Sequence, residues 1–175
     1  MTYSGKYKVK NVEKYDGDYT KVTYRSHWEK LCMMWCDGNT QVAKWSSEET
    51  VIPYYYDVDK KYHRYFMDLK IKYKDGKTVL VEIKPKKETE APNKVGKTKQ
   101  RYLNEALTYV KNQNKWKAAF EYAKDRAWSF EIWTEDTLKG MGIMKEIKTA
   151  KKLKPLKPNK KPLKITVWQT KQHYF

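Results

Sequence analysis

A hydrophobic stripe with helical spacing occupies the chain just before residue 40. Its positions advance by three and four residues at a time, as on one face of an amphipathic helix. They are Trp28, Leu31, Cys32, Trp35 and Cys36. Ser26 is a favoured N-cap, and Glu29 stands three positions later, where an acid can close a capping box. The Asp-Gly-Asn sequence at 37–39 is a stop signal, so we predict a helix between Ser26 and this point.

Alternating positions then replace the helical period and predict a group of strands. The candidate segments are residues 20–25, 41–45, 50–56, 63–73 and 78–84. Pro53 restricts its segment to a sheet edge or a bulge, because proline cannot donate to a strand ladder. Residues 63–73 alternate from end to end, and a turn signal follows at 74–77. We therefore predict one long strand over 63–73, joined by a hairpin to a return strand over 78–84.

The return strand carries charge within an otherwise apolar segment. By two-residue alternation one side receives Val79, Val81 and Ile83, and the other receives Leu80, Glu82 and Lys84. A buried charge is costly unless it is paired or used in chemistry. An ordinary Glu–Lys pair on a wetted strand face explains the spacing alone equally well. Because Leu80 shares the face with Glu82, a partly covered face is the favoured interpretation.

The C-terminal half returns largely to helical spacing. We predict a polar loop over 85–96, a helix over 97–112, a second helix capped by Asn114, a strand over 127–134 and a short helix over 135–138. The apolar stripe of the first of these helices consists of Leu103, Ala106, Leu107 and Val110. The pattern as a whole predicts an α/β (strictly α+β) domain, with a mixed sheet of four or five strands flanked by helices.

The composition changes at residue 145. Residues 145–175 hold ten lysines and one glutamate, and so carry +9 of the net charge of +17. Lysine and proline dominate residues 151–164, where few apolar side chains are present to build a core. We predict a folded domain with an N-terminal extension over 1–144, followed by a basic Lys/Pro-rich C-terminal arm over 145–175.

The net charge of +17 and the 15% aromatic content are typical of proteins that contact phosphate backbones, although a merely soluble cationic protein has the same composition. No apolar run approaches the roughly 20 residues of a membrane-spanning helix. The N-terminus lacks the apolar core of a signal peptide. Cys32 and Cys36 are helix neighbours, poorly placed for a disulfide, and with three histidines in the chain a zinc site is not expected. These features favour an intracellular protein.

A constellation of charged residues can form at the predicted hairpin. In a suitable antiparallel register, Asp68 lies on the face that carries Glu82 and Lys84. Two carboxylates beside a lysine offer hard oxygen ligands that suit Mg²⁺ or Mn²⁺. Such a metal polarises a phosphoryl oxygen, and the lysine can share the negative charge of the transition state. Glu29 can join this site or serve only as a helix cap.

Asp68 followed by Glu82-Ile83-Lys84 resembles the signature of PD-(D/E)xK nucleases, with Met67 where that pattern usually has proline. A longer ordered set of motifs resembles head completion nucleases of T-even-type tailed phages over most of residues 8–140: KNVEKYDGD, YRSHWEKLCMMWCD, WSSEETVIPYYY, HRYFMDLKIKYKDG, VLVEIKPKKE and FEIWTEDTL. The chain also resembles, more loosely, the TnsA-like endonucleases of transposons. The resemblance implies a restriction-endonuclease-like core and a metal-dependent DNA endonuclease. It also implies catalytic roles for Glu29, Asp68, Glu82 and Lys84. The predicted metal ligands are Asp68 and Glu82, with Glu29 as a third candidate.

Further candidates surround this set. His63 precedes Asp68 in the same predicted strand and can touch the scissile phosphate or relay a proton, although it is as readily a strand-edge histidine. Six cations are candidate DNA phosphate contacts, and each is also compatible with a solvated surface position. They are Arg25, Lys86, Lys87, Lys97, Lys99 and Arg101. Glu48 and Glu49 fit a turn better than the site.

These observations lead to one functional hypothesis and two rivals. The hypothesis is Mg²⁺-dependent hydrolysis of DNA phosphodiester bonds, with low sequence specificity, in phage head completion after DNA packaging. The expected location is the host cytoplasm during virion assembly or the virion itself, with head, portal or neck proteins as partners of the arm. One rival is a structural DNA-binding head or portal protein with a vestigial site. The other is a TnsA-like transposase endonuclease subunit.

Overall fold

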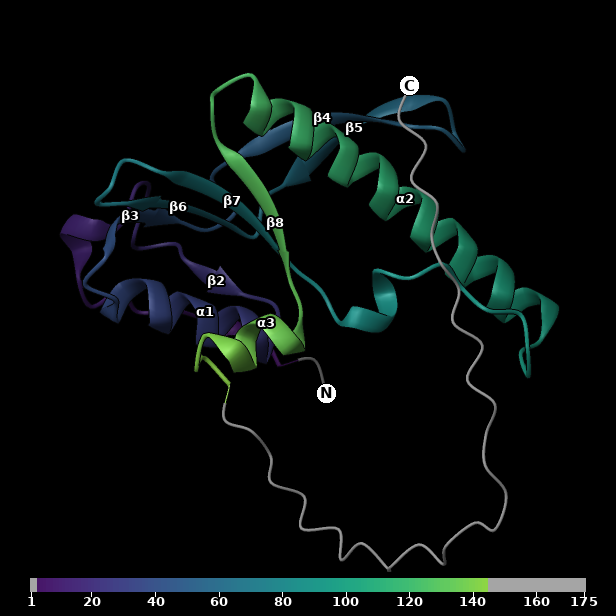
Figure 1. Ribbon diagram of the computed structural model, residues 1–175, viewed down its shortest axis with the longest axis horizontal. Helices are drawn as coiled ribbons and strands as arrows, with labels where there is room; N and C mark the ends of the chain where they lie inside the picture. The colour runs from purple at the N-terminus through teal and green to yellow at the C-terminus, as the bar shows by residue number, and fades with distance from the viewer. Residues whose placement is uncertain (1–2, 145–175) are drawn as a thin grey trace, which may run out of the picture.

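The computed structural model describes residues 3–144 (Figure 1), and the predicted basic arm over 145–175 lies outside them. A four-stranded mixed sheet with the order β3-β6-β7-β8 forms the centre. Its strands are β3 (Val42–Ser46), β6 (Leu69–Tyr73), β7 (Thr78–Ile83) and β8 (Ser129–Trp133). The first three pair antiparallel, and β8 runs parallel to β7. The predicted fold class, a mixed sheet flanked by helices, is confirmed.

Two smaller sheets and three helices surround this centre. The small sheets pair β1 (Gly5–Lys6) with β2 (Thr23–Tyr24), and β4 (Val51–Tyr56) with β5 (Lys61–Phe66). The helices are α1 (His27–Gly38), α2 (Lys99–Lys124) and α3 (Glu135–Gly140), with short 3₁₀ turns η1 (Val12–Lys14) and η2 (Lys86–Glu88). No helix within residues 3–144 is both long and apolar enough to cross a membrane.

The two faces of the central sheet have separate hydrophobic cores. Helices α1 and α3 cover one face, and α2 with the β4–β5 hairpin covers the other (Figure 1). Strand β7 serves both cores, because Val79, Val81 and Ile83 pack on the α1 side while Leu80 packs on the α2 side. All six residues of β7 are buried. The predicted alternation is therefore confirmed, and so is the covered face that carries Glu82.

Helix α1 and the hairpin turn follow their sequence signals closely. The hydroxyl of Ser26 accepts the backbone N–H of Glu29 at 3.1 Å, and the helix ends at Gly38. At the turn between β6 and β7, Gly76 has a φ of +91°, which L side chains rarely adopt. Cys32 and Cys36 are buried and free, as their helical spacing predicted.

The single long strand predicted over 63–73 is wrong. The segment divides into β5 and β6, which belong to different sheets, with Met67 and Asp68 between them. The backbone of Met67 pairs with that of Thr50 and Glu48. Tyr65 and Met67 consequently pack in the α2-side core, whereas Leu69 and Ile71 pack in the α1-side core. The two-residue period continues through the break, so it gave no sign of the change of face.

The prediction of two helices over the 97–124 region is also wrong. Helix α2 is continuous over 26 residues. Asn114 does not cap a helix, because its side chain accepts the backbone N–H of Asp57 at 3.1 Å and donates to the Asp57 carboxylate at 2.7 Å. In the N-terminal half, the predicted core positions Leu103 and Leu107 are exposed. The buried residues of α2 all lie from Asn112 onwards.

A buried aspartate fastens the N-terminal segment to the end of α1. Asp37 is 2% exposed and accepts the backbone N–H groups of Lys10 and Asn11 at 2.8 and 2.9 Å. The hydroxyl of Tyr7 also donates to it, at 3.2 Å. This carboxylate thus satisfies backbone groups that have no ladder partner, and it fixes the helix that carries Glu29.

We predict that Asp37→Ala lowers the free energy of unfolding by roughly 2–4 kcal/mol, because two backbone N–H groups lose their acceptor. Urea unfolding followed by circular dichroism measures the effect. Asp136→Ala is the control, since its carboxylate is exposed on α3 and should leave the urea midpoint close to that of the wild type. Equal midpoints for both variants would contradict the assigned role of Asp37.

Candidate active site

A buried glutamate lies at the C-terminal end of β7. Glu82 is 3% exposed, and both of its carboxylate oxygens have partners. The hydroxyl of Tyr65, on β5, donates to Oε2 at 2.6 Å. The ammonium of Lys84 lies 3.2 Å from Oε1. The predicted Glu–Lys pair is therefore formed on a covered face, where its charges are poorly screened by water.

Asp68 reaches the same site from the break between β5 and β6. Its Oδ2 accepts the backbone N–H of Ile83 at 2.7 Å, which ties it to the end of β7. Burial raises the pKa of Asp68 well above its ordinary value, and the negative charges of Glu82 and Glu29 raise it further. The N–H of Ile83 and the charge of Lys84 oppose this only in part. Two acids are thus held close enough to resist ionising together.

Lys84 follows β7 directly, and its backbone N–H donates to the carbonyl of Trp133 on β8 at 3.0 Å. Burial alone lowers the pKa of Lys84, but the charges of Glu82 and Asp68 outweigh it, so the pKa is raised. The side chain is partly exposed. The charged ammonium of Lys84 therefore lies beside the buried carboxylate of Glu82 and near the half-buried carboxylate of Asp68.

Glu29 lies in the first turn of α1, near the same group of charges. Its Oε2 accepts the backbone N–H of Arg25 at 2.7 Å. The predicted capping box with Ser26 is wrong in this detail, because the carboxylate reaches one residue further back than the N-cap. Its negative charge contributes to the raised pKa of Asp68. Helix capping and membership of the site are therefore compatible for this side chain.

Arg25 and His63 are engaged outside this group. The guanidinium of Arg25 pairs with Glu48, at 2.7 Å from Nε and 3.1 Å from Nη2. The imidazole of His63 lies in the β4–β5 hairpin, where Nε2 is 2.7 Å from the Asp59 carboxylate and the ring lies near that of Tyr54. Among the contacts in residues 3–144, none joins His63 to Asp68, Glu82 or Lys84, so its catalytic role stays a prediction.

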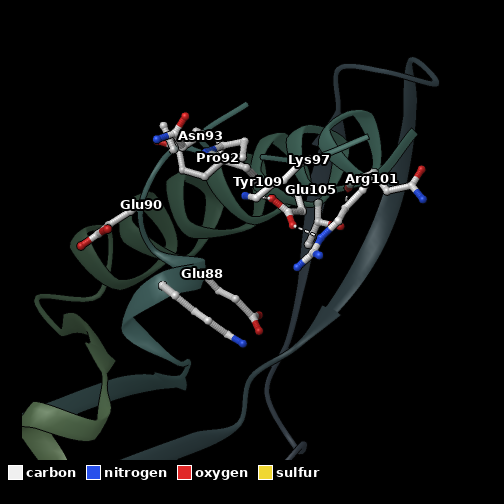
Figure 2. Close-up of a pocket in the computed structure, with 12 residues that line it drawn as sticks. Glu88, Glu90, Pro92, Asn93, Lys97, Arg101, Glu105 and Tyr109 are labelled. Carbon is white, nitrogen blue, oxygen red and sulfur yellow. Dashed lines mark hydrogen bonds and ion pairs between the residues drawn. The ribbon is translucent and has the colours of Figure 1, made fainter. Parts of the chain in front are cut away.

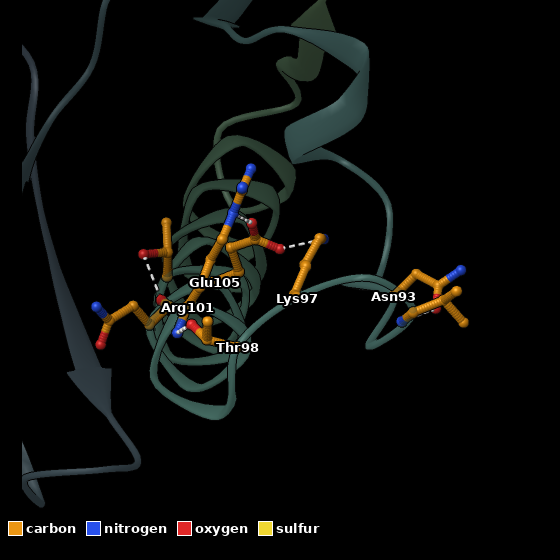
Figure 3. Close-up of polar contacts among 8 residues, drawn as sticks. Asn93, Lys97, Thr98, Arg101 and Glu105 are labelled. Carbon is orange, nitrogen blue, oxygen red and sulfur yellow. Dashed lines mark hydrogen bonds and ion pairs between the residues drawn. The ribbon is translucent and has the colours of Figure 1, made fainter.

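The remaining predicted cations lie along the loop after β7 and the start of α2. Lys86 pairs with Asp136 at 2.9 Å. Lys97 and Arg101 both pair with Glu105, as Figure 3 shows. Lys87, Lys97 and Arg101 line an open cavity of about 590 Å³ between this loop and α2 (Figure 2). Lys99 is exposed at the first position of the helix. Acidic side chains partly neutralise this surface, and DNA binding by its lysines and arginines stays a prediction.

The donor set can be tested for a divalent metal. No group of three or more His, Cys, Asp and Glu side chains within residues 3–144 is arranged to hold a metal ion by itself. Asp68 and Glu82 nevertheless supply two carboxylates at one place. Mg²⁺ commonly uses one or two carboxylates and completes its shell with water and substrate phosphate oxygens. The residues present fit that mode of binding, with Glu29 close enough to act on the pair electrostatically.

Two residues at this site were missed by the sequence analysis. Tyr65 donates to Glu82, and Lys115 of α2 has its ammonium 4.9 Å from the centre of the Tyr65 ring. Burial raises the pKa of Tyr65, and the charge of Glu82 raises it further, so the phenol stays a hydrogen-bond donor. The alternation of residues 63–73 predicted only a core position for Tyr65. Nothing in the sequence relates a helix lysine to a strand more than thirty residues earlier.

Comparison with known proteins gives two matches. The family model of the TnsA-like endonuclease N-terminal domain matches residues 39–135, which include Asp68, Glu82 and Lys84 but not Glu29. The chain is also 46% identical over 147 residues to the head completion nuclease of Enterobacteria phage T4. That alignment covers 82% of this chain and 98% of the phage T4 protein.

The strained position of Asp68 predicts a pH-dependent gain in stability for Asp68→Asn. The folded protein holds the Asp68 proton at pH values where the unfolded chain has released it, so the contribution of Asp68 to wild-type stability falls as the pH rises above about 4. The variant lacks this loss. The stability of Asp68→Asn relative to the wild type should therefore increase as the pH rises above about 4, by up to about 1.4 kcal/mol for each pH unit, until the pH passes the pKa of Asp68 in the folded protein. Urea unfolding in EDTA across this range measures the difference.

Asp75→Asn is the matched control. Its carboxylate is exposed and accepts the N–H of Lys77, which lowers the pKa of Asp75. A lowered pKa stabilises the folded protein at neutral pH, so Asp75→Asn should be slightly less stable than the wild type there. This difference in stability should disappear as the pH falls towards the acid range. A pH-independent difference for Asp68→Asn would show that the Asp68 carboxyl titrates normally.

Proposed function

This chain belongs to the family of proteins with a TnsA-like endonuclease N-terminal domain, and from that membership we propose that it is a divalent-metal-dependent DNA endonuclease of phage head completion. The relative that is 46% identical bears the name head completion nuclease, and the alignment spans nearly its whole length. The proposed stage is the end of DNA packaging, in the host cytoplasm or on the assembling virion.

One observation carries the proposal: Asp68, Glu82 and Lys84 converge at the end of β7. Burial and the nearby charge of Glu82 both raise the pKa of Asp68, so the two carboxylates disfavour each other's ionisation. Such perturbed groups concentrate at functional sites, where a ligand relieves the repulsion. A divalent cation would stabilise the ionised forms of both carboxylates. An ordinary Glu–Lys pair on the surface would need no such cation.

Asp68 and Glu82 are the residues that would hold Mg²⁺ or Mn²⁺, with Glu29 acting directly or through water. The bound metal would polarise a phosphoryl oxygen and lower the pKa of the attacking water. The protein's own contribution is positional. The N–H of Ile83 and the hydroxyl of Tyr65 orient the two carboxylates, and each does so through a short hydrogen bond.

Lys84 supplies the fixed positive charge. Its ammonium is anchored beside Glu82, and its backbone is held by β8. From there it can donate to a non-bridging phosphate oxygen and to the attacking water. A charge placed in advance stabilises the extra negative charge of the transition state without reorganisation. Hydrolysis by this route needs no covalent intermediate between the enzyme and DNA.

The rival proposal, a structural DNA-binding head protein, predicts binding without hydrolysis. It leaves the buried Glu82 and the repulsion at Asp68 without a purpose. The transposase-subunit proposal rests on the family model, which describes a TnsA-like domain. The near-complete alignment with a phage head protein favours the head completion role.

We predict that the purified protein nicks or linearises supercoiled plasmid in Mg²⁺ or Mn²⁺ and not in EDTA. Glu82→Gln should lower the rate at least about 100-fold, because it removes a ligand charge and the partner of Lys84. Glu121→Gln is the control, because the Glu121 side chain is exposed on α2. This variant should cleave at the rate of the wild type. Agarose gels and single-turnover rates give the readout.

The same preparations distinguish the rival. If wild type, Glu82→Gln and Glu121→Gln all retard duplex DNA equally and none cleaves with either metal, the endonuclease proposal is wrong. Cleavage that survives Glu82→Gln would place the chemistry elsewhere in the chain.

A further inference from the structure

A lysine of α2 lies against the proposed site from the side opposite to the sheet strands that build it. The ammonium of Lys115 is 4.9 Å from the centre of the Tyr65 ring, and the hydroxyl of that ring donates to Glu82. Lys84 forms an ion pair with the other oxygen of the same carboxylate. The chain of contacts therefore runs from Lys115 through Tyr65 and Glu82 to Lys84.

Helical geometry explains why Lys115 is held there. It shares a face of α2 with Asn112, three residues before it, and Ala119, four residues after it, and both are buried. The residue after Lys115, Trp116, is buried as well. Trp116 and Ala119 bind this half of the helix to the domain, so the root of the Lys115 side chain is fixed. The side chain is itself only partly exposed.

Lys115 lacks an acidic partner of its own. Among the ion pairs within residues 3–144, none includes Lys115. Burial lowers the pKa of Lys115, and the charge of Glu82 opposes that effect. Lys115 is a half-buried cation that contacts an aromatic ring and forms no ion pair among residues 3–144. Its charge is therefore incompletely compensated, and an anion brought to it would supply the missing negative charge.

We propose that Lys115 contacts a phosphate of the substrate DNA beside Asp68 and Glu82, as a second cation of the active site in addition to Lys84. The inference rests on the proposed function for the identity of the anion. A phosphodiester strand that enters the site passes Lys84 at the end of β7, and it meets α2 next. Two cations on different elements then hold the strand, one near the scissile phosphate and one beside it.

The competing interpretation is purely structural, with Lys115 packing its stem and charge on Tyr65. Lys115→Met separates the two, because methionine keeps an unbranched apolar stem over the ring and removes the charge. Lys117→Met is the matched control. Lys117 is exposed on the same helix, and two residues of helix turn it by about 200° away from Lys115. Both substitutions change the net charge equally.

The first test is binding of a short mixed-sequence DNA duplex in EDTA, by fluorescence anisotropy at several salt concentrations. For Lys115→Met we expect roughly 5- to 10-fold weaker binding at low salt. The slope of log Kd against log salt should fall by about 1, as for one lost phosphate contact. Lys117→Met should change neither. Equal losses for the two variants, or no loss for Lys115→Met, would overturn the proposal.

The second test is single-turnover plasmid cleavage in Mg²⁺ at saturating protein. Lys115→Met should cleave at least about 10-fold more slowly than Lys117→Met, with a melting temperature close to that of the wild type, and Lys115→Arg should recover part of the rate. If the wild type cleaves nothing, the endonuclease proposal fails, while the binding test in EDTA still decides whether Lys115 contacts phosphate. If Lys115→Met cleaves and binds DNA as well as the wild type does, Lys115 is a packing residue only.

Discussion

The carboxylate of Glu82, buried on the central strand, is the constraint around which the rest of the site is arranged. A charge in that position must be compensated locally, because water cannot reach it. Three elements supply the compensation: β5 gives the hydroxyl of Tyr65, the end of β7 gives Lys84, and the covering helix α2 brings Lys115 near. The two cores on either face of β7 hold these elements in place.

Compensation of Glu82 does not extend to Asp68, and this imbalance is what gives the site its chemical character. Asp68 receives one backbone N–H, while burial and two neighbouring acids disfavour its charge. A fold selected for stability alone would replace one of these acids with a neutral side chain. Retaining both leaves an energetic deficit that a cation and a phosphate can relieve, as is usual for sites that bind charged ligands.

The break between β5 and β6 makes this arrangement possible. A continuous strand over residues 63–73 would have kept Tyr65 and Leu69 on the same face. With the break, Tyr65 faces the α2-side core and reaches Glu82, while Asp68 reaches the backbone at the end of β7. The β4–β5 hairpin separates from the central sheet at the same point and packs with α2. One local interruption thus brings the hydroxyl of Tyr65 and the carboxylate of Asp68 to the same strand end.

Local signals along the chain were enough to predict several of the elements. The cap at Ser26, the turn at Gly76 and the alternation of β7 depend on neighbours within a few residues, and they were predicted correctly. A suitable hairpin register was also expected to allow Asp68 to meet the end of β7, where its Oδ2 accepts the backbone N–H of Ile83. Three features became known only from the folded molecule: Glu29 accepts the backbone N–H of Arg25, α2 continues past Asn114, and Tyr65 and Lys115 approach Glu82. These depend on contacts between residues far apart in the chain, whose free energies are set by burial and by the charges that packing brings together.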